Sequence, residues 1–190
     1  MVGAAVVACT LALAPGVDTP DSSAVLERSA FHVRSVDPRA QAWIQAGAQG
    51  SSTFRDLLDR LSTSDLIVYV EITDRINGAV GHTYIVTSTA SVRYVRIEVV
   101  LGGNFPEMVA LVGHELQHAV EIAGAPHVRD RQTLAQFYLS KAENWGGTVQ
   151  FDSREARETE DRVKRELASY VAYRPLRSDQ ASARFKHQNP

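Results

Sequence analysis

The spacing of apolar residues in the first third of the chain is typical of helices. Residues 39–47 and 53–62 repeat their apolar positions with a helical period. The second segment also carries a start signal, because Thr53 can act as the N-cap while Asp56 occupies the third helical position. Two short helices are therefore expected before residue 63.

The pattern then changes to one that favours β-strands. Residues 65–72, 83–87 and 92–100 are runs rich in β-branched and aromatic side chains. The breaks between these runs contain turn residues, among them Asn77 and Gly78. This pattern predicts three strands joined as an antiparallel meander.

A helical pattern returns at residue 104 and continues to about residue 173, with a glycine-rich interruption at 146–147. Helices, three strands and then more helices predict an α+β domain. We expect a small antiparallel or mixed sheet, packed on the helix after the last strand and followed by further C-terminal helices. The predicted organisation is a leader at 1–14, a linker at 15–38, a folded domain at 39–173 and a polar tail at 174–190.

Composition narrows the classes of protein that fit. The chain has 190 residues, 44% of them hydrophobic, which suits one domain with a substantial core. With 20 Lys and Arg against 22 Asp and Glu, the net charge is −2. Such a balance gives no electrostatic reason to expect nucleic acid as a partner. The single cysteine, Cys9, excludes an internal disulfide framework.

The N-terminal segment 2–14 is apolar and uncharged, but it is shorter than the roughly 20 residues that a membrane-spanning helix needs. It is typical of the apolar part of a signal peptide, which predicts export to the periplasm or beyond the cell and no integral membrane span. Ala12-Leu13-Ala14 has the form of a cleavage site, and residues 6–9 have the form of a lipobox that would lipidate Cys9. The alternative is a buried apolar segment in a cytoplasmic protein.

The chemistry suggested by the sequence lies in the expected helix after the third strand. His114, Glu115 and His118 form an HExxH motif. Residues four apart lie on one face of a helix, so the two imidazoles can hold one Zn²⁺. Glu115 lies further round the same side, where it can act as a general base towards a water on the metal without being a ligand.

The surrounding residues support a well-defined helix. Asn104 can cap it, with Glu107 placed to close a capping box, and Gly124 ends it after about 19 residues. A helical wheel places a set of apolar residues on the side away from the histidines: Val109, Val112, Leu116, Ala119, Val120 and Ala123. The motif is therefore expected beside the core.

A catalytic zinc ion needs a third protein ligand. A metzincin would have histidine at position 124 and glycine at 121, where this chain has Gly124 and Glu121, so that class is excluded. His127 lies beyond the helix end and is interpreted as a loop residue. The remaining candidates are acidic residues further along the chain: Glu143, Asp152 and Glu158.

Four segments resemble a group of mostly exported bacterial HExxH proteins of zincin type. They are 64–71 (SDLIVYVE), 93–96 (RYVR), 111–121 (LVGHELQHAVE) and 165–167 (REL), and the resemblance covers roughly residues 50 to 170. Where that group has Phe-Glu-Thr, this chain has Phe151-Asp152-Ser153. The resemblance thus implies a zincin-like fold with Asp152 as the third ligand, ahead of Glu158 and then Glu143.

These observations lead to one functional hypothesis and one alternative. We expect a monomeric, exported zinc hydrolase, most simply a metallopeptidase that cleaves a peptide or protein and uses Glu115 as general base. The strand at 92–100 would line the cleft and pair with the substrate; otherwise it is an ordinary sheet edge protected by Arg93 and Arg96. The alternative function is a catalytically inactive zincin-like module of the cell envelope that binds a metal or a partner.

Overall fold

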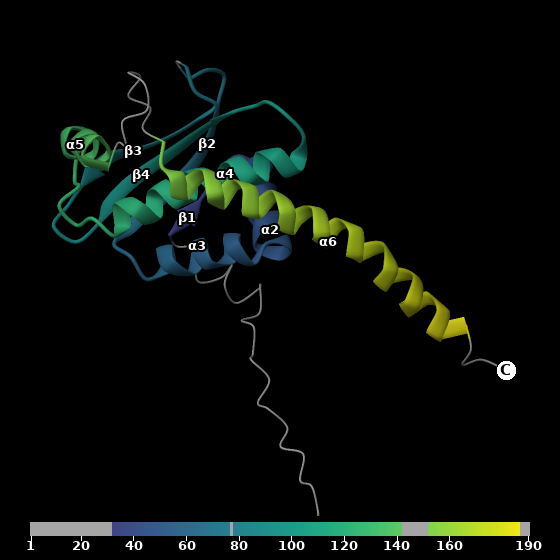
Figure 1. The fold of residues 1–190 in the computed structure, drawn as a ribbon. Coiled ribbons are helices and arrows are strands. Elements are labelled where there is room, and N and C mark those ends of the chain that lie inside the picture. The colour runs from purple at the N-terminus through teal and green to yellow at the C-terminus, as the bar shows by residue number, and fades with distance from the viewer. Residues whose placement is uncertain (1–31, 77, 142–151, 187–190) are drawn as a thin grey trace, which may run out of the picture.

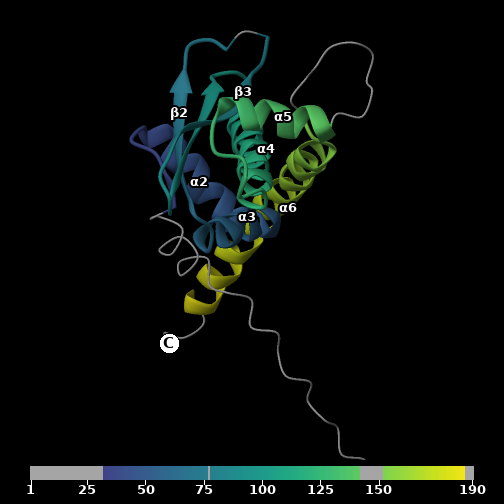
Figure 2. The ribbon, with the colours of Figure 1, turned by 90° about the vertical axis from the view of Figure 1, so that its left-hand side faces the viewer.

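A mixed β-sheet forms one layer of the fold, and helices cover one of its faces (Figures 1 and 2). The computed structural model describes residues 32–76, 78–141 and 152–186. The predicted leader, most of the predicted linker, Cys9 and Glu143 lie outside the described residues. Within those residues, the α+β class predicted from the order of elements is confirmed.

The sheet has four strands in the order β1-β2-β4-β3. Strand β2 pairs in parallel with β1 on one side and with β4 on the other, while β3 and β4 form an antiparallel hairpin. The strands are β1 (Val33–Arg34), β2 (Leu66–Thr73), β3 (Gly81–Ser88) and β4 (Arg93–Val100). The sheet is therefore mixed, and the predicted antiparallel meander is wrong.

One contact that supports this order joins residues far apart in the sequence. The guanidinium of Arg93 pairs with the carboxylate of Asp65 at 2.6 Å, where the start of β4 lies beside the start of β2. Strand β4 consequently has partners on both sides, so the expectation that 92–100 forms the edge of a substrate cleft is also wrong. Arg93 is fully buried and cannot protect an edge. The edge strand on that side is β3.

Two short helices precede β2, as the sequence predicts, but the second begins differently. Its N-cap is Ser51, whose hydroxyl oxygen accepts a hydrogen bond from the backbone N–H of Phe54. Thr53, the predicted cap, instead donates its hydroxyl to the carboxylate of Glu166. The helices among the described residues are α2 (Pro38–Gly50), α3 (Ser52–Ser62), α4 (Phe105–Ala123), α5 (Arg131–Lys141) and α6 (Arg154–Lys186).

Helix α4 lies between the sheet and α6, which makes it the central element of the fold (Figure 2). Its predicted capping box is present: Asn104 accepts from the N–H of Glu107, and Glu107 accepts from the N–H of Asn104. The predicted apolar side is buried or partly buried. Gly113 permits the close approach of α6, because a Cβ there would lie 3.2 Å from Val163.

Helix α6 continues to Lys186, beyond the expected end of the helical region at about residue 173. Its last part extends away from the other elements (Figure 1). Pro175 is a signal for a helix end, because it lacks the backbone N–H that an interior helical position donates, yet the helix runs through it. Among the described residues, no helix combines the length and apolar character that a membrane crossing requires.

Glu166 joins α6 to the first turn of α3, and this contact carries a prediction about stability. Its carboxylate accepts hydrogen bonds from the hydroxyls of Ser51, Ser52 and Thr53 and from the Thr53 N–H. Burial opposes the charged form, but the hydrogen bonds from Ser51 and Thr53 outweigh it and lower the pKa of Glu166. We expect Glu166→Gln to lower the free energy of unfolding at pH 7 by about 1–3 kcal/mol, measured by denaturant titration.

The pH dependence distinguishes this charge effect from general damage. A lowered pKa contributes stability that is present above the ordinary carboxyl value of 4.5 and is lost as the pH falls through the folded-state pKa. The difference between wild type and Glu166→Gln should therefore shrink below about pH 4. Asp161→Asn removes the same charge at an exposed position of the same helix and should cost less than about 0.5 kcal/mol. A difference that is independent of pH would contradict this account.

Candidate metal centre

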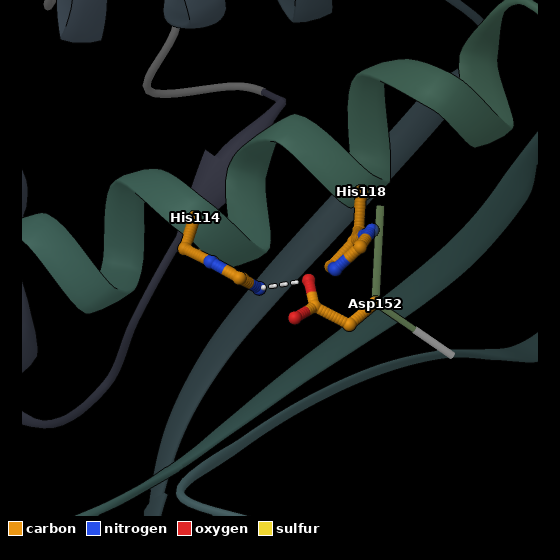
Figure 3. A group of neighbouring side chains, drawn as sticks. All are labelled: His114, His118 and Asp152. Carbon is orange, nitrogen blue, oxygen red and sulfur yellow. Dashed lines mark ion pairs between the residues drawn. The ribbon is translucent and has the colours of Figure 1, made fainter. Parts of the chain in front are cut away.

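Two histidines of α4 and one aspartate before α6 converge on a common point (Figure 3). His114 and His118 are one helical turn apart, and their ring centroids are 5.0 Å apart. Asp152 precedes α6 and places its Oδ1 atom 3.4 Å from Nε2 of His114. One potential ligand atom from each residue lies within 4.8 Å of the others. The structure thus brings together the three residues selected from the sequence as metal ligands.

The carboxylate of Asp152 has an oxygen whose hydrogen-bonding capacity is unused. Oδ1 is buried and makes no well-formed hydrogen bond among the described residues; its 3.4 Å contact with Nε2 of His114 is an ion pair. The other oxygen, Oδ2, lies 3.5 Å from Nε of Arg157. Because a buried carboxylate oxygen normally has a donor or a cation as partner, Oδ1 is the clearest sign that this point suits a cation.

The opposite nitrogen of each imidazole contacts a carboxylate. Nδ1 of His114 lies 3.1 Å from Glu160, whose carboxylate also accepts from Lys164. Nδ1 of His118 lies 3.2 Å from Glu121. Histidines that bind metals commonly donate their second ring N–H to a carboxylate, which fixes the tautomer and leaves the other nitrogen free to coordinate. Both rings are therefore arranged to present Nε2 to the shared point.

A tyrosine from α5 completes the surroundings of His118. The hydroxyl of Tyr138 lies 3.0 Å from Nδ1 of His118, and the two rings meet edge to face. Burial, followed by the negative charges of Glu121 and Glu115, raises the pKa of Tyr138. The hydroxyl therefore keeps its proton and can donate a hydrogen bond within this cluster.

The electrostatics of the cluster favour positive charge. Burial disfavours a charged His114, but its close contacts with the carboxylates of Asp152 and Glu160 outweigh it and raise the pKa of His114 to about 9. The hydrogen bond from His114 likewise lowers the pKa of Glu160 to about 2. Burial opposes ionisation of Asp152, yet its contacts with His114 lower its pKa. The site is therefore a pocket of carboxylates that stabilises a cation, whether a proton or a metal.

The general-base candidate, Glu115, is held in a pocket made by the edge strand β3. Its side chain is buried, and Oε2 accepts a hydrogen bond of 2.6 Å from the hydroxyl of Thr83. The other oxygen, Oε1, packs against the backbone of Gly81, where a Cβ would clash with it. Glu115 is thus fixed by residues 30 or more positions earlier in the chain.

The other sequence candidates do not join the cluster. Glu158 is exposed and pairs with Arg154 at 2.7 Å. The structure therefore gives no support to Glu158 as the alternative third ligand. His127 is an exposed residue between α4 and α5, as predicted, and its ring packs near Phe137. Glu143 lies outside the described residues.

Several residues of the site were missed from the sequence. Glu121 could have been found, because it is three positions after His118 on the same face of α4. Glu160, Tyr138 and Thr83 come from three other elements and have no local signal that points to the HExxH helix. Their roles depend on tertiary packing alone.

No protein-family model, curated protein or solved structure matches this chain. The site must therefore be interpreted from its own residues. The site offers two imidazole nitrogens and one carboxylate oxygen, a donor set that binds divalent transition metals. Further carboxylates contact the opposite nitrogens of the two imidazoles.

Proposed function

We propose that this protein is a zinc-dependent hydrolase of zincin type, with His114, His118 and Asp152 as the metal ligands. The observation that carries the proposal is the convergence of these side chains around Oδ1 of Asp152, a buried oxygen that makes no well-formed hydrogen bond among the described residues. Three protein ligands are typical of catalytic zinc sites, which keep a fourth position for water or substrate, whereas structural sites use four.

The residues around the metal position suit hydrolysis. When bound, Zn²⁺ supplies a Lewis acid that polarises a carbonyl and acidifies water. Glu115 takes up the proton of the attacking water and later passes it to the leaving group. Thr83 donates to Oε2 of this carboxylate, and Gly81 lets its other end pack against β3, so the side chain of Glu115 is held in one position.

A peptide is the substrate class that the sheet supports best. Strand β3 is the last strand of the sheet, and it carries the residues that hold Glu115. An extended peptide could add to this edge by main-chain hydrogen bonds, which would align it along the general base. A cavity lined by residues 85–88 and 129–132 lies at the far end of the same strand and could receive a side chain. We therefore propose a metallopeptidase.

The decisive experiment measures metal content and hydrolysis together. We expect the purified full chain to hold one zinc per molecule and to cleave members of a peptide library until a chelator is added. Asp152→Ala should weaken zinc binding by more than the roughly 10- to 100-fold that loss of an outer-shell partner costs. Glu158→Gln is the matched control, because its carboxylate is exposed and paired with Arg154.

Each result has a defined consequence. Absence of stoichiometric zinc from the wild type would overturn the metal site. Wild-type zinc affinity in Asp152→Ala would overturn the ligand assignment. Stoichiometric zinc without cleavage of any peptide would overturn the peptidase proposal and favour the alternative of a binding module.

A further inference from the structure

A buried carboxylate joins two of the proposed metal ligands from behind. The side chain of Glu121 is 5% exposed and lies near the end of α4. One of its oxygens, Oε2, is 3.2 Å from Nδ1 of His118. The other, Oε1, accepts a hydrogen bond of 2.5 Å from the hydroxyl of Ser153. A single side chain thus contacts one ligand directly and the immediate neighbour of another.

Ser153 connects this carboxylate to the backbone beside Asp152. Its hydroxyl oxygen also accepts a hydrogen bond of 3.0 Å from the N–H of Ala156, in the first turn of α6. The backbone after Asp152 is therefore fixed at the start of α6 and, through the hydroxyl, to α4. Asp152 and His118 are 34 positions apart, and Glu121 is the residue that links their segments.

The donors around Glu121 explain why a carboxylate occupies this buried position. A neutral His118 that coordinates through Nε2 must carry its proton on Nδ1, where Glu121 can accept it. Ser153 donates to the second oxygen, and the hydroxyl of Tyr138 lies in the same cluster. A carboxylate accepts from all of these donors, whereas a glutamine would turn an N–H group towards one of them. Packing alone would not require the charge.

We propose that Glu121 is a positioning residue that sets the tautomer of His118 and, through Ser153, the location of Asp152, so that metal affinity depends on it. This inference rests on the proposed zinc site. It assigns to Glu121 and Ser153 a function that neither the HExxH motif nor the ligand set includes.

The test measures zinc affinity of the full chain by competition with a chromogenic chelator, and the visible absorption of the Co²⁺-substituted protein. Glu121→Gln should bind zinc about 10- to 100-fold more weakly and should alter the Co²⁺ spectrum. Ser153→Ala should weaken zinc binding less, and Ser153→Thr, which keeps the hydroxyl, should restore it. Glu158→Gln should match the wild type, because Glu158 contacts none of these residues in the described structure.

A second comparison separates positioning from general stability. If Ser153 acts through Asp152, Ser153→Ala should lower zinc affinity in the wild type but not in an Asp152→Ala background. An equal loss in both backgrounds would overturn the link through Asp152. Wild-type zinc affinity and an unchanged Co²⁺ spectrum in Glu121→Gln would overturn the inference while the zinc site itself stands. If Glu121→Gln fails to fold, the zinc affinities of Ser153→Ala and Ser153→Thr still test the link from Glu121 through Ser153 to Asp152.

Different results would overturn the proposed function and the proposed role of Glu121. Wild-type protein that holds no stoichiometric zinc would overturn both the zinc site and the role of Glu121. Wild-type protein that binds zinc but cleaves no peptide would overturn only the peptidase proposal, because the affinity measurements on Glu121 and Ser153 need no activity.

Discussion

Replacing Glu115 by glutamine is expected to lower kcat by about 100- to 10,000-fold while the protein keeps its zinc. Glutamine has the size of glutamate, so the hydroxyl of Thr83 can still donate to its side-chain oxygen and Gly81 still leaves space for its end. What glutamine lacks is the ability to accept a proton from water at neutral pH. The measurement is kcat on a cleaved peptide together with the zinc content of each preparation.

The control for this variant is a second Glu→Gln change away from the site. Glu158→Gln alters an exposed carboxylate on α6 and should leave both kcat and zinc content unchanged. Two outcomes would contradict the assignment of Glu115 as general base. One is wild-type kcat in Glu115→Gln. The other is loss of zinc from that variant, which would mean that the carboxylate holds the site together instead of moving a proton.

The part of the site that could be predicted from the sequence is the part encoded on one helix. The capping box between Asn104 and Glu107 and the end at Gly124 define α4 by local signals, and both are present in the structure. Helical geometry alone then places His114 and His118 on one face. These predictions needed no knowledge of the rest of the chain.

Asp152 is a different case, because spacing alone left three acidic candidates open. Resemblance selected it, and the structure places it beside His114 while Glu158 points to Arg154. The position of Asp152 is determined by how α6 packs against α4, including the close approach at Gly113. Such packing is a property of the whole fold, and no local pattern in the charged segment around residue 152 encodes it.

The wrong helix cap and the wrong strand order have the same physical origin. Thr53 is a good N-cap by local rules, but Glu166, which lies 113 residues further along the chain, takes its hydroxyl, and Ser51 caps the helix instead. The alternation of buried and exposed residues determines which face of a strand is buried, but it does not determine which strand is its neighbour. The ion pair between Arg93 and Asp65 helps to set that order, and its importance leads to the second large effect.

Replacing Arg93 by methionine is expected to lower the free energy of unfolding by about 3–5 kcal/mol. The guanidinium is fully buried and binds the carboxylate of Asp65 through two nitrogens. Its other N–H groups donate to backbone carbonyls at and after the C-terminal end of α4: Ile122, Ala123, Ala125 and Val128. Methionine matches the length of the aliphatic part but leaves these carbonyls without a donor.

Two controls isolate the cause in denaturant titrations of the full chain. Arg96→Met changes the neighbouring arginine of β4, which is 38% exposed and pairs with Glu71 at the surface, and should cost less than about 1 kcal/mol. The loss of unfolding free energy in Asp65→Asn should lie between those of Arg93→Met and Arg96→Met, because Asp65 is 35% exposed and water can replace part of the lost contact. Equal costs for Arg93→Met and Arg96→Met would contradict the role of the buried guanidinium.

Because Arg93 binds the turn of α4 that follows His118, its loss should also weaken zinc binding, whereas Arg96→Met should not.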